Sequence, residues 1–393
     1  MRGIAFLAWR YLALHRAKTV LLVLSITLMG YVPTGLRVLV GKSADALSAR
    51  ADATPLLVGT KGSALELTLS SLYFESEPPA PTTFAEAQRI ADSGLALAIP
   101  LHVRFRARGH PIVGTSLEYF ELRGLTVEAG RNLARLGECV VGADVAAAEN
   151  LAPGDYLVSS PESVFDLAGV YPLRMPVVGV LARTGGPDDR AVFCDVKTTW
   201  VIEGLGHGHQ DVASPEAASA VLERDEQRVV ANASLVQYNE ITSENEASFH
   251  FHGSRATFPV TAVLAVPHDE KSAALLRGRY LDADERSQIV HPAGVMDELL
   301  ETVFTVQRYV TLALAFVGVS TLIVTGLVFL LSAQLRRREI ETMSKIGVAR
   351  GTIAAILAAE VGLVVLMSLA VAVGLTLALE RWGDALLRGL LVS

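Results

Sequence analysis

The sequence is poor in cysteine, in charge and in catalytic motifs. Its 393 residues include two cysteines, Cys139 and Cys194, which are too few for a disulfide scaffold and lack zinc-ribbon spacing. Charged residues make up 19% of the chain and the formal net charge is −7, so nothing predicts the basic surface that nucleic-acid binding requires. The patterns G-x-x-x-x-G-K-[ST] and H-E-x-x-H are both absent. These absences argue against a phosphate loop for ATP and against zinc-dependent hydrolysis by this chain.

Long uncharged runs are what the sequence has instead. Residues 19–36 and 309–333 contain no charge, and residues 353–379 contain one, Glu360. About 20 apolar residues cross the hydrocarbon core of a bilayer as a helix. A cleaved signal peptide is the alternative for the first run, but that run exceeds a usual h-region and no A-x-A site closes it. The runs therefore predict three transmembrane helices, at 19–40, 306–334 and 353–380, and Pro33 would kink or end the first.

The basic residues next to the runs predict the orientation of the chain. Positive charges cluster before the first run and directly after the second, where Arg336, Arg337 and Arg338 are consecutive. Lys and Arg beside a transmembrane helix favour the cytoplasmic side. This places an interfacial helix (residues 1–18) and a loop (335–352) in the cytoplasm. It places a large domain (43–304) and a short tail (381–393) on the outer side.

The segment between the first two runs has the pattern of an α+β domain. Short apolar runs bounded by turn residues predict strands, and helix-like stretches lie between them. The predicted strands are 54–59, 96–105, 138–142, 175–182, 190–196 and 258–266, and the predicted helices include 83–94 and 145–151. Near residue 304 the apolar spacing of Val295, Leu299, Val303 and Val306 predicts one helical face, as in a stalk that continues the second span. The expected fold is thus a three-span membrane protein with a large α+β extracytoplasmic domain inserted between spans 1 and 2.

The loop between the second and third spans combines charge with amphipathicity. In RRREIETMSKIGVARG, three arginines lead into a short helix with Ile340, Met343 and Ile346 on one side. The arginines suit the anionic inner leaflet, and the apolar side suits a groove on a cytoplasmic partner. Gly347 would end the helix. The residues predicted to contact a partner are Arg336, Arg337, Arg338, Glu339, Ile340, Met343, Lys345, Gly347 and Arg350.

These patterns together resemble one known family. The order R-R-R-E-I, K-I-G-V-A-R and A-A-E resembles the permeases of the MacB, FtsX and lipoprotein-release family of ABC transporters. The segments GTSLEYFELRGLTVEAGRNL, ECVVGADVAAAENLAPGDYL and MPVVGVLARTGGPDDRAVFCDV resemble the periplasmic core domain of such permeases. The family usually has four spans, whereas this sequence contains three.

The resemblance implies a non-catalytic permease subunit in the bacterial inner membrane. A separate ATPase subunit would bind ATP and Mg²⁺. A second permease copy or a paralogue would complete the membrane part of the transporter. A periplasmic protein could be a further partner. ATP-driven motion would then move the outer domain in order to export or extract a cargo, which is called mechanotransmission. Two alternatives remain. One is an FtsX-like subunit that regulates a periplasmic enzyme, and the other is a permease of a zinc-linked system.

Glu360 and the arginines each have two interpretations. Glu360 lies about 10 Å into the third span, at 1.5 Å per residue, where a carboxylate is a functional candidate by default. The structural interpretation is that it pairs with an arginine of the loop or of the N-terminus. The arginines themselves could serve only as membrane anchors, or they could also contact the ATPase.

Four of the nine histidines form two H-x-H pairs, His207 with His209 and His250 with His252. In a strand this spacing places both rings on one face, and imidazole suits zinc or copper. A tetrahedral site would require the two pairs to meet in space. The alternative is that both pairs lie in ordinary polar loops.

Two further sets of residues carry weaker predictions. Cys139 and Cys194 lie in apolar strand-like runs, where either free buried thiols or one disulfide is consistent with the sequence. Asp188 and Asp189 have the surroundings of turn acids, and a calcium loop would need more oxygen ligands.

Overall fold

The computed structural model describes residues 2–160, 172–208, 221–225, 228–231, 239–282 and 284–391. The chain forms two compact units. One, called here the helical unit, comprises Met1–Leu47 and Glu298–Ser393, and the other, called here the sheet domain, comprises Ser48–Asp297.

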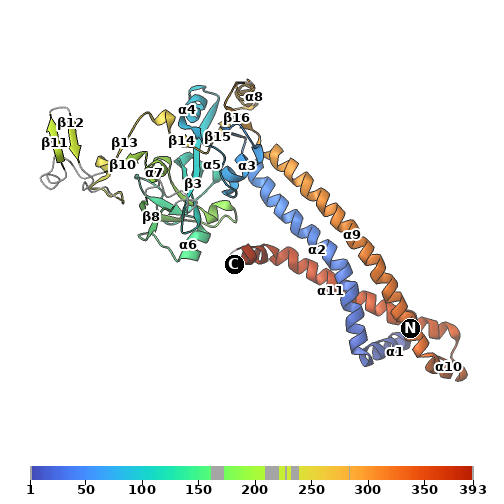
Figure 1. The fold of residues 1–393 in the computed structure, drawn as a ribbon. Helices are drawn as coiled ribbons and strands as arrows, with labels where there is room; N and C mark the ends of the chain where they lie inside the picture. Colours follow the sequence, from blue (N-terminus) through green and yellow to red (C-terminus); the bar gives the residue numbers. More distant parts are fainter. Residues whose placement is uncertain are drawn as a thin grey trace. The chain divides into compact units, whose positions relative to one another are not determined.

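The helical unit consists of long apolar helices (Figure 1). Its elements are α1 (Arg2–Leu14), most of α2 (Arg16–Asp52), most of α9 (Pro292–Leu335), α10 (Arg337–Lys345) and α11 (Arg350–Leu391). Within the described residues, three helices are long and apolar enough to cross a membrane: Arg16–Asp52, Pro292–Leu335 and Arg350–Gly383. Large apolar side chains such as Phe316, Ile323 and Leu366 stay exposed along them, as lipid-facing residues do. The three-span fold class predicted from the sequence is confirmed.

Two helix ends differ from the expected ones. Pro33 lies inside α2, and the helix continues beyond it to Asp52. The hydroxyl of the next residue, Thr34, donates to the Gly30 carbonyl at 2.7 Å. Likewise, the tail expected from residue 381 is helical as far as Leu391. As predicted, Gly347 follows α10 with a φ of +95°, which glycine adopts readily.

Side-chain contacts hold α2, α9 and α11 together in the helical unit. A small apolar cluster joins Leu12, Leu22 and Val364, with Val328 and Phe329 against it. The buried hydroxyls also bond between helices, because Thr27 donates to the Ser368 carbonyl and Ser368 to the Val23 carbonyl, both at 3.3 Å. Such hydroxyl bonds and close packing are the usual means of helix association in lipid.

The sheet domain is organised around one mixed sheet. In the described residues ten strands take part, in the order β16-β1-β15-β3-β4-β9-β6-β8-β5, with β7 paired to β8. The strands are β1 (Leu56–Thr60), β3 (Ala96–Ala107), β4 (His110–Thr115), β5 (Val127–Gly130), β6 (Cys139–Val141), β7 (Tyr156–Val158), β8 (Arg174–Leu181), β9 (Val192–Asp195), β15 (Ala262–Pro267) and β16 (Ser287–Val290). Each of the six runs predicted as strands overlaps at least one of the described strands.

Burial along the strands explains why these segments form a sheet. Alternate residues of β8 are buried, which is the period of a strand with one covered face. All three residues of β6 are buried, as in a central strand covered on both faces. Two apolar clusters result, one around Val141, Val177 and Val192 and the other around Trp200 and Val263.

Short helices cover the sheet. They are α3 (Ala64–Thr68), the π-helix η1 (Leu69–Tyr73), α4 (Phe84–Asp92), α5 (Leu117–Arg123), α6 (Ala143–Glu149), η2 (Pro187–Arg190), α7 (Val196–Ile202), η4 (Glu246–Ser248), η5 (Arg255–Thr257) and α8 (Glu270–Gly278). Capping side chains begin several of them. Asp195 accepts from the Lys197 amide and Asp269 from the Ser272 amide, which satisfies otherwise unpaired N–H groups.

Three two-stranded ladders complete the described part of the domain. They are β10 (Gly206–His207) with β13 (His250–Phe251), β11 (Val221–Asp225) with β12 (Arg228–Ala231), and β14 (Pro259–Val260) with β2 (Thr82–Thr83). The first of these brings together two segments that contain the histidine pairs.

Candidate functional site

The loop between α9 and α11 is anchored by an ion pair. Arg336 donates from Nη1 to both carboxylate oxygens of Glu360, at 2.8 and 3.1 Å. Both side chains are largely buried, with 12% of Arg336 and 4% of Glu360 exposed. The structure thus supplies the arginine partner that the structural interpretation of Glu360 requires. An intramembrane carboxylate with such a partner carries no unpaired charge.

Aromatic and polar side chains of α1, α2 and α9 surround this pair. The guanidinium carbon of Arg336 lies 3.6 Å from the centre of the Tyr11 ring, a cation–π contact. The ammonium of Lys18 lies 5.5 Å from the same ring and donates to Ser332. The N-terminal helix is therefore part of the support of the loop.

The remaining residues of the loop project outward. Arg337 has 83% of its side chain exposed and makes one ion pair, with Glu341 at 3.2 Å, whereas Arg338 is exposed. Ile346 has 77% of its surface exposed directly after α10, and Ile340 and Met343 are half-buried. Glu339, Lys345, Gly347 and Arg350 are exposed as well. Of the nine residues predicted to contact a partner, Arg336 is thus engaged inside the unit, and the others lie at or near the surface.

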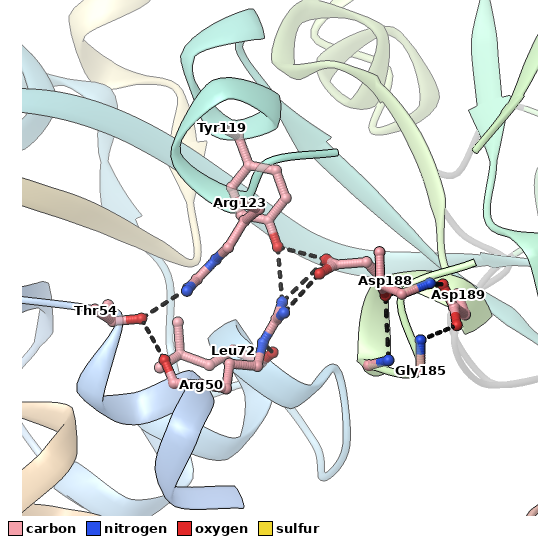
Figure 2. Close-up of polar contacts among 10 residues, drawn as sticks. Arg50, Thr54, Leu72, Tyr119, Arg123, Gly185, Asp188 and Asp189 are labelled. Atoms are coloured by element: carbon pink, nitrogen blue, oxygen red, sulfur yellow. Dashed lines mark hydrogen bonds and ion pairs between the residues drawn. The ribbon is translucent and has the colours of Figure 1, made fainter. Parts of the chain in front are cut away.

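A second polar cluster lies inside the sheet domain and fastens the last turn of α2. Figure 2 shows Arg50 donating to both oxygens of Asp188, at 2.6 and 3.0 Å, and to the Tyr119 hydroxyl at 2.8 Å. Tyr119 in turn donates to Asp188 at 2.7 Å, and Arg50 Nε donates to the Leu72 carbonyl. Arg50 and Asp188 are 9% and 4% exposed. This is a bidentate, buried ion pair whose members have several hydrogen bonds.

Neighbouring bonds hold the same turn and the loop of Asp188. Arg123 donates to the Thr54 hydroxyl at 2.7 Å, and Thr54 donates to the Arg50 carbonyl at 2.9 Å (Figure 2). Asp189 accepts from the Gly185 amide at 2.7 Å. A Cβ on Gly142 would come within 2.3 Å of the Asp188 carbonyl oxygen, so only glycine fits beside this loop. Asp188 and Asp189 are therefore buried structural acids and more than turn residues.

Burial shifts the titration of the groups in this cluster. Burial raises the pKa of the Tyr119 hydroxyl, so the phenol stays protonated and can donate to Asp188. Burial also lowers the pKa of Arg123. Arg50 was not singled out by the sequence analysis. The sequence gives one indication of its role, because Arg50 is a charged residue in the last turn of a helix that begins as a membrane span.

The two cysteines lie opposite each other on neighbouring strands. Cys139 of β6 pairs in register with Cys194 of β9, and both are free and fully buried. Burial raises the pKa of both thiols, which suppresses the reactive thiolate. The structure therefore has free buried thiols, one of the two arrangements that the sequence left open.

We expect neither thiol of the folded chain to react with a disulfide reagent such as DTNB at neutral pH. Both should react once guanidinium unfolds the domain, because unfolding removes the burial that keeps them protonated. Counting released chromophore before and after unfolding, without reductant, checks this. Fast reaction in the folded state would contradict it, and so would no reaction after unfolding.

The histidine pairs meet in part. His207 of β10 lies opposite His250 of β13. Ligand atoms of His207, His250 and His252 all lie within 4.8 Å of one another, and each pair of ring centres is 4.9 Å apart. His209, predicted as the fourth ligand, lies outside the described residues. The sequence anticipated the pairs but not the ladder that joins them.

Comparison with known proteins gives likenesses of fold. No protein-family model matches the chain, and no curated protein gives a significant match. One similar solved structure is the extracellular domain of the noncanonic ABC-type transporter YknZ from Gram-positive bacteria, with 13% identity and a TM-score of 0.33, covering 60% of this chain and 99% of that one. Another is the periplasmic region of MacB from Actinobacillus actinomycetemcomitans, with 10% identity and a TM-score of 0.32, covering 63% of this chain and 92% of that one.

Proposed function

We propose that this chain is the membrane subunit of an ABC transporter in the bacterial inner membrane. In this proposal a separate ATPase binds the loop around α10, and ATP-driven motion passes through the spans to the sheet domain. The observation that carries the proposal is the loop itself. It presents exposed arginines on a short amphipathic helix between two span helices, and an exposed Ile346 directly after that helix.

The arginines of the loop differ in their contacts, and this difference supports a docking role for α10. Arg336 is bound to Glu360 and stacked on Tyr11, so it supports the loop from inside. Arg337 and Arg338 face outward, where one local ion pair of Arg337 contributes little stability. Exposed arginines beside a large exposed apolar side chain are typical of interface residues that gain energy on binding a partner.

Transmission to the sheet domain would use the continuous helix α2. The helix runs without a break from Arg16 to Asp52. Its last turn is held by Arg50 through the buried pair with Asp188 and through Tyr119. A displacement of this helix would then be delivered to η2 and α5 and not absorbed by a flexible linker. ATP and Mg²⁺ belong to the partner ATPase in this scheme, and the sheet domain acts on a cargo or on a periplasmic partner.

We expect the double variant Arg337→Glu and Arg338→Glu to lose the ATPase that purifies with the wild-type chain. Charge reversal places two acids where the partner meets two bases, and like-charge contacts at an interface cost several kcal/mol. The measurement is vanadate-sensitive ATP hydrolysis in the complex isolated from native membranes in mild detergent. We expect a drop of at least about tenfold, which corresponds to about 1.4 kcal/mol of binding.

The matched control is Arg381→Glu, an exposed arginine on the side of the membrane predicted to be opposite. It should leave the associated ATPase activity unchanged. Equal yield and equal elution volume of all variants would show that folding is intact. Full ATPase activity with the double variant would count against the coupling role of α10.

A further inference from the structure

We propose that His207, His250 and His252 form a binding site for a divalent transition-metal ion of the zinc or copper class on the sheet domain. The inference stands on the geometry of the β10–β13 ladder and does not depend on the proposed ATPase coupling. Three imidazoles whose ligand atoms all lie within 4.8 Å of one another can share one ion. Zinc sites with three protein ligands keep a fourth position for water or an incoming group.

The ladder explains why the three rings meet. Gly206 pairs with Phe251 and His207 with His250, so both histidines of that pair project to the same face. The His252 amide donates to the Leu205 carbonyl at 3.2 Å, which continues the pairing beyond the ladder. Because side chains alternate along a strand, His250 and His252 share that face. His207 therefore faces one histidine directly and the other diagonally.

The opposite face of the ladder anchors it to the core. Phe251 packs with Trp200, with ring centres 6.3 Å apart, and it contacts both apolar clusters of the domain. Phe249 packs against the first cluster. A Cβ on Gly206 would lie 2.6 Å from the Phe251 ring, and a Cβ on Gly208 would lie 2.5 Å from the Phe249 ring. The glycines of GLGHGH thus leave room for the phenylalanines of FHFH, and the histidines remain on the outer face.

Hydrogen bonding orients one of the rings for metal binding. Nδ1 of His250 lies 3.0 Å from the Ser248 carbonyl oxygen. A carbonyl can only accept, so Nδ1 carries the hydrogen and the lone pair of a neutral ring is on Nε2. Histidine ligands of metals commonly have this backbone bond on the other nitrogen, where it sets the tautomer and the ring direction.

The choice of metal follows from the donor atoms. Nitrogen ligands favour zinc, copper and nickel over magnesium and calcium, which prefer oxygen. His252 is exposed and His207 is half-buried, so the ion would be reachable from the solvent. A solvent-reachable ion with an open position suits sensing an ion or passing it on.

The test uses the full-length chain in detergent, purified with a tag that contains no histidine. Calorimetric titration with Zn²⁺ should show one ion per chain with a Kd below about 10 µM. Titration with Co²⁺ should give the visible absorption of a nitrogen-ligated ion. His250→Ala and His252→Ala should each weaken binding at least about tenfold, since even residues behind metal ligands change affinity by that factor.

His268→Ala is the matched control, because His268 is an exposed histidine of the same domain outside the cluster. It should bind zinc as the wild type does. A second measurement covers variants that fold poorly: zinc should raise the unfolding temperature of the wild type and of His268→Ala, but not that of His207→Ala.

Each outcome decides the proposal. Failure of the wild type to bind zinc or cobalt overturns it, and so does an equal loss with His268→Ala. The variant Arg337→Glu with Arg338→Glu should keep full zinc binding, so failure of the coupling proposal is distinguishable from failure of this one.

Discussion

Replacing Asp188 by alanine is expected to destabilise the sheet domain by about 3–5 kcal/mol, the cost of removing one partner of a buried ion pair. The variant leaves the guanidinium of Arg50 buried without its carboxylate, and it also removes the acceptor of the Tyr119 hydroxyl. Since typical domains are stable by 5–15 kcal/mol, this is a large share of the total.

Unfolding by guanidinium, followed through tryptophan fluorescence, measures the loss. Trp200 is buried in the sheet domain, whereas Trp9 and Trp382 are exposed and can be replaced by phenylalanine to isolate its signal. The control is Asp144→Ala, which breaks the half-exposed pair with Arg183 and should cost at most about 1 kcal/mol.

A double variant separates the ion pair from its surroundings. Arg50→Met combined with Asp188→Leu should lose less than the sum of the two single losses, because no buried charge remains. Additive losses, or a cost of Asp188→Ala no greater than that of Asp144→Ala, would mean that the pair contributes little.

Arg336→Ala is expected to destabilise the helical unit by about 3 kcal/mol, since a charged side chain left unpaired at the depth of a span costs this order of energy. Glu360 would lose both hydrogen bonds from the guanidinium, and Tyr11 would lose its cation–π partner. Glu360→Gln should cost less, because it removes the buried charge and leaves Arg336 close to Glu339 at the end of the span.

Thermal unfolding of the full chain in detergent, read by size-exclusion chromatography after heating, ranks these variants. Arg337→Ala is the control, because its exposed pair with Glu341 along one helix is worth about 0.3–0.5 kcal/mol. Arg336→Gln combined with Glu360→Gln should restore much of the stability lost in Arg336→Ala. If Arg336→Ala unfolds at the same temperature as Arg337→Ala, the pair has no anchoring role.

The fold could be predicted where local patterns decide it. Uncharged runs longer than a bilayer is thick give the spans. The run ECVVG gives a strand in which every residue is buried, and MPVVGVLA gives a strand in which alternate residues are buried. The turn at residue 347 could be predicted because its φ is positive, and glycine is the residue type that adopts a positive φ easily. Of the two outcomes predicted for Pro33, a kink or a helix end, the end does not occur, because α2 continues to Asp52.

The sites depend on long-range pairings that no local pattern shows. Arg50 meets Asp188 of η2 across 138 positions of the chain, and it also meets Tyr119 of α5 across 69 positions. The H-x-H pairs were recognised as possible ligands, but their meeting depends on the register of β10 with β13. One step of slippage would place His207 opposite a different residue and turn the rings to different faces.

Side chains alternate between two faces of the β13 segment, and we expect the two faces to tolerate substitutions differently. Phe249 and Phe251 face the core and belong to its apolar clusters, so they are constrained by stability. His250 and His252 lie between and beyond them on the outer face, where substitutions leave the packing untouched. During evolution the histidines could therefore be gained, exchanged or lost one at a time while the domain stays folded. The candidate metal ligands of this surface and the side chains that pack beneath it therefore alternate from one residue to the next.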